Sequence, residues 1–327
     1  MTVESGTTAV VELPRPRSGD RPPGQRVARR GGRRSSPPGE PRKLAYLYIL
    51  PAVAVFIAFI GVPLVRTMSL SLYEWDGLGD KAWAGSANYR EVFTDPELRG
   101  AFVHALVLIV FYAVIPVVLG TMIAATMMRS RRLRGLGFFR VVIFLPLVVP
   151  MVVVAIAWRQ IYQPDGPLNS LLRFVGLDSL ARPWLGDYTW ALPAVGLVGT
   201  WVSTGLCFVL ALAGMANIPR ELYEAARLDG AGAVREFFAI TLPAIRGELS
   251  VALTLTVIAA LKTFDLVYVM TSGGPGTETT VPSYQVFRHA FQLGRVGTAT
   301  ALALVLTAIV FVATVAINRL GSERSRS

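Results

Sequence analysis

Two ionisable residues, Lys262 and Asp265, lie inside the hydrophobic stretch "ELSVALTLTVIAALKTFDLVYVM". A charged side chain is costly at the depth of a bilayer, and it usually faces a partner charge or a water-filled path. On a continuous helix, residues three apart share a face, so these two could form an ion pair that stabilises the helix. The alternative is that both line a path for a polar solute. The residues alone leave the two interpretations open.

No group of residues has the types and spacing of a catalytic or metal site. The phosphate-binding pattern G-x-x-x-x-G-K-[ST] is absent, since no glycine is followed by lysine. His104 and His289 are far apart in the sequence and belong to no cluster with metal-ligand spacing. The "GGPG" at 273–276 predicts a turn. We therefore expect no enzyme activity, no ATPase site, no cofactor and no metal in this chain.

The composition is that of a membrane protein. Hydrophobic residues make up 53% of the chain and charged residues only 16%, against about 25% charged residues in a soluble domain. The net charge of +11 does not indicate nucleic-acid binding, because ten of the 32 Lys and Arg lie in the first 43 residues. Residues 1–43 are rich in Pro, Gly, Ser and Arg and predict a disordered basic tail. The lone Cys207 is interpreted as a small buried hydrophobe.

Six stretches meet or approach the roughly 20 apolar residues that cross a bilayer as a helix. They predict an all-α integral membrane protein whose transmembrane domain covers 44–320, with spans at about 44–65, 103–126, 139–161, 190–215, 248–270 and 297–318. Prolines inside these stretches predict kinked helices; they are Pro116, Pro146, Pro150 and Pro193.

The distribution of basic residues predicts the orientation. If the N-terminus is cytoplasmic, the inner segments hold 22 Lys and Arg and the outer loops nine, which is the bias expected of cytoplasmic loops. An even number of spans then places the tail 1–43 and the C-terminal tail 321–327 in the cytoplasm of a multi-pass cell-membrane protein. The first outer loop, about 66–102, either caps the bundle or contacts a protein outside.

The polar stretch "ELYEAARLDGAGAVREFFAITLP" (221–243) lies between the fourth and fifth spans, on the cytoplasmic side. Pro219 suits a first helical turn, Asn217 is a plausible cap, and Gly230 suits the end of a helix. We expect one short helix at 219–229, a second at about 232–240, and a break at Pro243. Taken alone, the composition fits an amphipathic helix on the inner leaflet.

The order of residues in this stretch resembles the "EAA" loop of permease subunits of ATP-binding-cassette importers. Glu224-Ala225-Ala226, then Gly230, then Ile240-x-Leu242-Pro243 match every position of that pattern; Gly247 departs from it where many relatives carry proline. "FRVVIFLPLVVP" (139–150), "WRQIYQPDGPLN" (158–169) and "FDLVYVMTSGGPG" (264–276) look like the carbohydrate-uptake subfamily. The resemblance covers about 44–320 and is to the first permease of maltose- and glycerol-3-phosphate-type importers, which depend on a binding protein.

The resemblance implies a MetI-like permease fold of six transmembrane helices with a cytoplasmic coupling loop that docks on an ATPase. The implied coupling residues are Glu224, Ala225, Ala226, Asp229, Gly230, Ile240, Leu242 and Pro243. It also implies that substrate contacts fall on the fifth span and on the span before the loop. The candidate path residues are Trp201, Ser203, Thr204, Lys262, Thr263 and Asp265, where an aromatic face and hydroxyls suit a pyranose ring.

We therefore expect the permease subunit of an importer for a sugar or related polyol. The implied partners are a second permease in a heterodimer, two copies of a cytoplasmic ATPase that binds the ATP, an extracellular binding protein and membrane lipid, with no nucleic acid. One alternative keeps the family and changes the cargo to an amino acid, a phosphonate or another small solute. Another is a secondary transporter or channel that works without ATP and has no need of such a loop.

Overall fold

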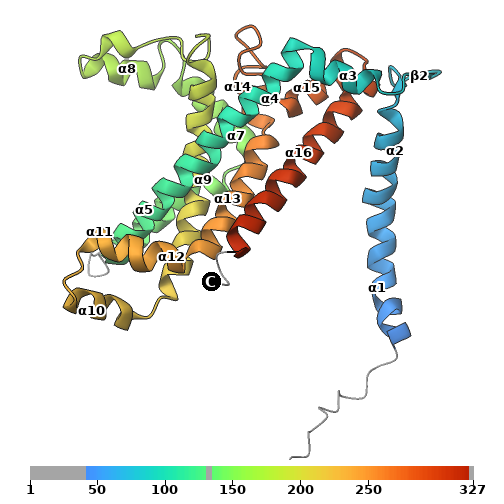
Figure 1. Cartoon of the computed structure of the whole chain (residues 1–327). Helices are drawn as coiled ribbons and strands as arrows, with labels where there is room; N and C mark the ends of the chain where they lie inside the picture. Colours follow the sequence, from blue (N-terminus) through green and yellow to red (C-terminus); the bar gives the residue numbers. More distant parts are fainter. Residues whose placement is uncertain (1–41, 130–134, 324–327) are drawn as a thin grey trace, which may run out of the picture. The chain divides into compact units, whose positions relative to one another are not determined.

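The computed structural model describes residues 42–129 and 135–323, which are mostly helical (Figure 1). The chain divides into two compact units, one ending at Phe56 and one beginning at Ile57. In the first unit, the described helix is α1 (Arg42–Phe56). The predicted tail 1–43 therefore lies outside the described residues except for its last two, which begin α1. Of the predicted C-terminal tail, 321–323 belong to the last helix and the remainder lies outside the described residues.

Four helices are long and apolar enough to cross a membrane: Tyr48–Leu70, Pro96–Arg129, Ala191–Ala216 and Val296–Arg319. The first continues from α1 through the π-helical segment η1 (Ile57–Gly61) into α2 (Val62–Leu70). The second comprises α4 (Pro96–Ile109), the π-helical segment η2 (Val110–Val114) and α5 (Ile115–Arg129). The others are α9 (Ala191–Ala216) and α16 (Val296–Glu323). The predicted first, second, fourth and sixth spans coincide with these helices.

The predicted third span is a bent pair of helices. α6 (Leu136–Val148) and α7 (Met151–Ile161) are bent by 101° relative to each other. Val149 between them is extended, with ψ of 132°, because a residue before proline avoids the helical region and Pro150 has no N–H to donate. The kink predicted from Pro150 is confirmed. Pro193, by contrast, lies in the uninterrupted α9, at the third residue of the helix, where its missing N–H costs nothing.

The predicted fifth span, expected to be one helix, is also interrupted. α13 (Arg246–Leu261) ends before Lys262, and a new helix, α14 (Asp265–Met270), starts three residues later. α13 is in turn bent by 71° against the helix that precedes it, Ala233–Ala244. The described residues therefore contain four single candidate spans, and six if each bent pair counts as one.

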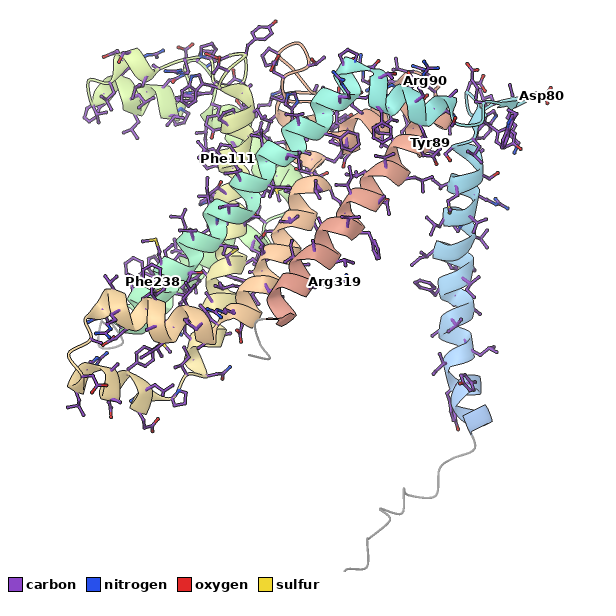
Figure 2. All side chains as sticks on the ribbon, in the orientation of Figure 1. Asp80, Tyr89, Arg90, Phe111, Phe238 and Arg319 are labelled. Atoms are coloured by element: carbon purple, nitrogen blue, oxygen red, sulfur yellow. The ribbon has the colours of Figure 1, made fainter. Side chains whose placement is uncertain are left out.

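Helix α9 packs closely against several others through its glycines. A Cβ on Gly199 would fall 2.1 Å from the ring of Tyr112, and one on Gly196 would fall 2.6 Å from the ring of Phe111. Both rings come from η2, and Phe111 is labelled in Figure 2. A Cβ on Gly205 would lie 2.6 Å from the carbonyl oxygen of Ile143 in α6. Small residues at helix contacts are how membrane helices approach each other, because lipid tails give no hydrophobic drive for association.

Short elements connect the ends of these helices. Strands β1 (Tyr73–Glu74) and β2 (Ala82–Trp83) form an antiparallel pair, followed by α3 (Ala87–Thr94). α8 (Pro167–Phe174) and the 3-10 turn η3 (Asp178–Leu180) lie between α7 and α9, and α15 (Pro282–Phe287) with the π-helical η5 (Arg288–Gln292) precedes α16. Buried Asn88 joins α3 to the end of α2 and to β1: its amide donates to the carbonyls of Ser71 and Tyr73, each at 2.9 Å.

Candidate functional site

The segment between α9 and α13, here called the 217–245 loop, begins with a nine-residue helix, α10 (Arg220–Leu228). Its predicted bounds of 219–229 are right to within one residue at each end. The predicted cap is wrong: Asn217 is the C-cap of α9, and Pro219 occupies the N-cap of α10 without a side-chain hydrogen bond. The preceding helix ends too close to α10 to leave Asn217 free for it.

The glycine that ends α10 behaves as predicted. Gly230 has φ of +80°, in the left-handed region. Its N–H donates to the carbonyl of Arg227 at 3.0 Å, and the N–H of Ala231 donates to that of Ala226 at 2.8 Å. This pair of bonds satisfies carbonyls that the end of a helix otherwise leaves without partners, and it needs a residue that tolerates positive φ.

Two side-chain contacts hold α10 against the rest of the loop. The guanidinium Nε of Arg227 donates to Oε1 of Glu236 at 2.7 Å, and the hydroxyls of Tyr223 and Thr241 are 2.8 Å apart. Glu236 is buried, with a side chain only 6% exposed, and Oε2 also lies 3.7 Å from Nη1 of Arg129 at the end of α5. The hydrogen bond from Arg227 lowers the pKa of the Glu236 carboxyl because it stabilises the charged form.

The eight predicted coupling residues divide between two environments. Those on or just after α10 are mostly exposed: Glu224, Ala225, Asp229 and Gly230 are exposed and Ala226 is half-buried. Ile240, Leu242 and Pro243 are half-buried in the second part of the loop. Leu228, which the pattern does not include, is 90% exposed. The free face of α10 thus combines small, acidic and apolar side chains in a form that a partner could cover.

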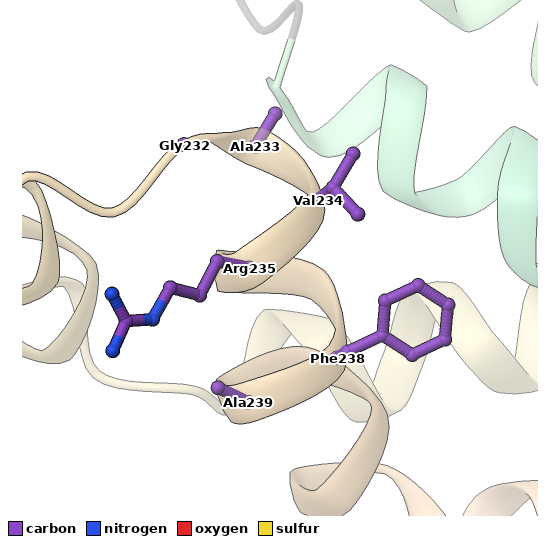
Figure 3. A pocket seen from close by; sticks show the side chains of 6 residues that line it. All are labelled: Gly232, Ala233, Val234, Arg235, Phe238 and Ala239. Carbon is purple, nitrogen blue, oxygen red and sulfur yellow. The ribbon is translucent and has the colours of Figure 1, made fainter.

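The second part of the loop is longer than the predicted 232–240. It consists of α11 (Ala233–Glu236), the π-helical segment η4 (Phe237–Thr241) and α12 (Leu242–Ala244). The predicted break at Pro243 is wrong, since the turn into α13 falls at Ile245; a proline near the start of a helical turn loses no hydrogen bond. Figure 3 shows an open hollow on this part, where Val234 and Phe238 point to one side and Arg235 to another.

A second candidate site lies at the interruption of the fifth span. A cavity of about 320 Å³ is lined there by Tyr112, Met151, Leu255, Ile258, Ala259, Lys262, Thr263, Phe264 and Asp265. The hydroxyls of Tyr112 in η2 and Thr263 in the break between α13 and α14 are 3.1 Å apart. Lys262 and Asp265 are exposed, whereas Thr263 is buried.

The structure decides against an ion pair between Lys262 and Asp265. They do not share a continuous helix, because Lys262 caps α13 and Asp265 begins α14. None of the ion pairs among the described residues joins them. Three of the six predicted path residues, Lys262, Thr263 and Asp265, are thus brought together around one cavity.

The three predicted path residues of α9 do not line this cavity. Trp201 is 45% exposed and packs edge-on against Trp158 of α7, with ring centroids 5.6 Å apart. Ser203 is buried, and the hydroxyl of Thr204 donates to the carbonyl of Thr200 one turn earlier at 2.7 Å. Sequence reasoning missed Tyr112, whose signal is a hydroxyl in the middle of the apolar run 105–120. It also missed Glu236 and Arg227, an acid and a base nine residues apart.

Within residues 42–129 and 135–323, no group of three or more His, Cys, Asp and Glu side chains is arranged to hold a metal ion.

A family model described as "Binding-protein-dependent transport system inner membrane component" matches residues 116–325. A probable ABC transporter permease protein of Bacillus subtilis, YurN, is 40% identical over 81% of this chain and 91% of its own. The diacetylchitobiose uptake system permease protein NgcF of Streptomyces coelicolor is 35% identical, over 82% and 79% of the two chains. The trehalose/maltose transport system permease protein MalF of Thermococcus litoralis is 33% identical, over 86% and 95%.

The fold is similar to that of a chain in a crystal structure of a bacterial ABC transporter involved in the import of the acidic polysaccharide alginate. The TM-score is 0.75 at 22% identity, over 86% of this chain and 96% of the other.

Proposed function

This chain belongs to the family of binding-protein-dependent transport system inner membrane components, and from that premise we propose that it carries a sugar across the cell membrane. Its relatives NgcF and MalF, 35% and 33% identical, are permeases for diacetylchitobiose and for trehalose and maltose. Because all three of these cargoes are neutral disaccharides, a small oligosaccharide is the best supported cargo for this chain. A secondary transporter that works without ATP does not belong to this family, so membership of the family excludes that alternative.

The cavity at the break of the fifth span is the proposed part of the path. It joins two hydroxyls, an ammonium and a carboxylate from different helices, and such groups can replace the water around a sugar through hydrogen bonds. Backbone that is not helical is tolerated at membrane depth where it lines a cavity or is covered by protein. The break between α13 and α14 therefore supports the proposal that Lys262, Thr263 and Asp265 line the path of the sugar.

The 217–245 loop is the proposed coupling element, with α10 as the helix that docks on an ATPase. The observation that carries this role is the exposed face of α10, on which Glu224 and Ala225 lie beside the 90% exposed Leu228. The other proposed parts of the assembly are a second permease in a heterodimer, two ATPase copies that bind the ATP, and a binding protein outside. Both termini and the loop face the cytoplasm in this proposal.

The experiment that tests the proposal is purification of the full chain in mild detergent, with identification of the proteins that accompany it. We expect a second permease, an ATPase and a binding protein, and the binding protein is then tested with diacetylchitobiose, trehalose and maltose. Gly230→Asp should reduce the ATPase recovered, whereas Gly232→Asp, at a position with negative φ, should not. A binding protein that takes an amino acid or a phosphonate would contradict the sugar assignment. An ATPase that stays attached to Gly230→Asp would contradict the coupling role.

A further inference from the structure

Glu236 is the point at which three helices of the cytoplasmic region meet. Its carboxylate accepts hydrogen bonds from Nε and Nη2 of Arg227, at 2.7 and 3.4 Å, and its Oε2 lies 3.7 Å from Nη1 of Arg129. Arg227 belongs to α10, Glu236 to α11, and Arg129 is the last residue of α5. One side chain thus connects the loop helix to the end of the second span.

This carboxylate differs from the other acidic groups whose burial the structure describes. Among the acidic residues of 46–129 and 137–319 it is the only buried carboxylate, although both of its arginine partners are about half exposed. A buried charge is costly unless it is paired and hydrogen-bonded, and removing one partner leaves the charge uncompensated. A site of this kind holds its neighbours in one arrangement and resists any movement that separates them.

Each end of the connection is fixed to a larger element. On α10, Tyr223 lies one turn before Arg227, so both side chains reach the second part of the loop from the same face. At the other end, α5 is packed tightly on α9: a Cβ on Gly120 would fall 2.6 Å from the backbone nitrogen of Phe208. The close packing of α5 on α9 therefore resists a displacement of α10 that is transmitted to α5.

We propose that Glu236 is a positioning residue that makes α10 and the second span move as one body. The inference rests on the proposed coupling role of α10. The chain itself connects α10 only to α9 and, through α11 and α12, to α13. The Glu236 contacts add α5, and α5 continues through η2, which carries Tyr112 at the cavity. Motion of an ATPase against α10 then reaches the cavity wall from the second span as well as from the fifth.

The test is a distance measurement by pulsed electron paramagnetic resonance on the full chain, alone and with its attached ATPase. Cys207 is replaced by alanine, and nitroxides are placed at Leu228→Cys on α10 and Met122→Cys on α5, both at exposed positions. With Glu236 in place, we expect one narrow distance that is the same without nucleotide and with ATP and vanadate. In Glu236→Gln, the population outside that distance should rise about threefold to tenfold.

Three further variants separate positioning from simple stabilisation. Arg129→Gln leaves the Arg227–Glu236 pair intact, and it should widen the distance distribution by a smaller factor of about two, with rescue by Arg129→Lys. Arg235→Gln removes a neighbouring exposed arginine that makes no ion pair among the described residues, and it should change nothing. A Glu236→Gln protein with a lower melting temperature but an unchanged, narrow distance would overturn the proposal. Because the distance is also measured without ATPase, this outcome is independent of whether Gly230→Asp releases the ATPase.

Discussion

At the scale of single residues, the contact between Tyr112 and Thr263 is the direct link between the second span and the break of the fifth. Both side chains are buried, and their hydroxyls are 3.1 Å apart in the wall of the cavity. Each hydroxyl can both donate and accept. A sugar hydroxyl in the cavity can therefore replace either partner without leaving a buried polar group unpaired.

We predict that Tyr112→Phe raises the KM for uptake, because it removes a hydroxyl from the proposed path. The loss of one hydrogen bond should lower stability by about 1 kcal/mol. Tyr162→Phe is the matched control: that hydroxyl donates to the carbonyl of Ala194 at 3.2 Å and does not line the cavity. Both variants should have a slightly lower melting temperature. Only Tyr112→Phe should change the kinetics of uptake of the sugar that the binding protein binds. Equal uptake kinetics in the two variants would remove Tyr112 from the path.

A second residue-scale prediction concerns acid. The hydrogen bond from Arg227 holds the pKa of Glu236 below its usual value, which is about 4.3 in an unfolded chain. A carboxyl whose folded pKa is lowered stabilises the fold above the unfolded pKa, and this contribution is lost as the pH falls through the folded pKa. The connection to Arg227 and Arg129 should be intact at pH 7 and should be lost only at a pH below the unfolded value of about 4.3, as the pH falls through the lowered folded pKa.

The mobility of a spin label at Leu228→Cys measures this loss. In the otherwise native protein, the label should become more mobile as the pH falls through the lowered pKa of Glu236. In Glu236→Gln it should be mobile at all pH values, with no transition. A transition of the same size in Glu236→Gln would mean that another group titrates.

The sequence predicts some of these residues and not others, for reasons of chemistry. Lys262 and Asp265 were found because an ionisable group in an apolar run needs an explanation. Tyr112 was missed because a tyrosine in such a run is as often part of the core. The Arg227–Glu236 pair was missed because it depends on how α10 folds back at Gly230, and residue spacing does not specify that turn geometry.

At the scale of elements, the turn after α10 depends on one glycine. We predict that Gly230→Ala lowers stability by about 1–2 kcal/mol, because alanine is strained at a φ of +80°. Gly232→Ala is the control, since Gly232 has φ of −79° and open space around its missing Cβ. Thermal melting of the purified protein should separate the two. Equal melting temperatures for Gly230→Ala and Gly232→Ala would show that the stability of the protein does not depend on the left-handed conformation at Gly230.

The contact of α9 with η2 is the second element-scale prediction. Gly199→Ala would place a methyl group 2.1 Å from the ring of Tyr112, and overpacking of this kind costs about 1–3 kcal/mol. Gly100→Ala on α4 meets no atom within 4 Å and should be neutral. We expect a lower melting temperature and weaker uptake in Gly199→Ala alone. An unchanged melting temperature and unchanged uptake in Gly199→Ala would mean that α9 and η2 can move apart at little cost in free energy.

The breaks in the helices could be predicted only in part. Pro150 specified the bend of the third span, because proline removes a donor and restricts the residue before it. The break at Lys262–Phe264 has no proline or glycine, and a hydrophobic run of 23 residues reads as one helix by length. It forms where Thr263 turns inward to Tyr112 while Lys262 and Asp265 remain exposed, a choice that depends on tertiary packing.

At the scale of the whole molecule, the prediction is orientation. Leu228 of the 217–245 loop and Phe174 of α8 are 90% and 88% exposed. In a Cys207→Ala background, Leu228→Cys should react with an impermeant thiol reagent only from the cytoplasm, and Phe174→Cys only from outside. Right-side-out and inverted vesicles make the comparison, with the unsubstituted background as control. Labelling of both sites from one side would reverse the assignment of the loops.

The general plan of the molecule was predictable because it follows from the bilayer. Length and hydropathy give the positions of 103–126, 190–215 and 297–318 to within a few residues at the C-terminal end of each helix. The N-terminal extension of the second span was not predicted: α4 begins at Pro96, where Asp95 caps it by accepting from the N–H groups of Glu97 and Leu98. Such extensions depend on capping and on loops that pack together, which hydropathy does not detect.

The interrupted fifth span also bears on how a cell makes this protein. The ends of α13 and α14 leave backbone groups without helical partners, and each such group costs several kcal/mol if lipid covers it. A newly made copy with no companions has to hide that region or be recognised as defective by the proteases of the membrane. We therefore expect its steady-state abundance to follow the scarcest member of the assembly, and an overproduced single chain to be short-lived.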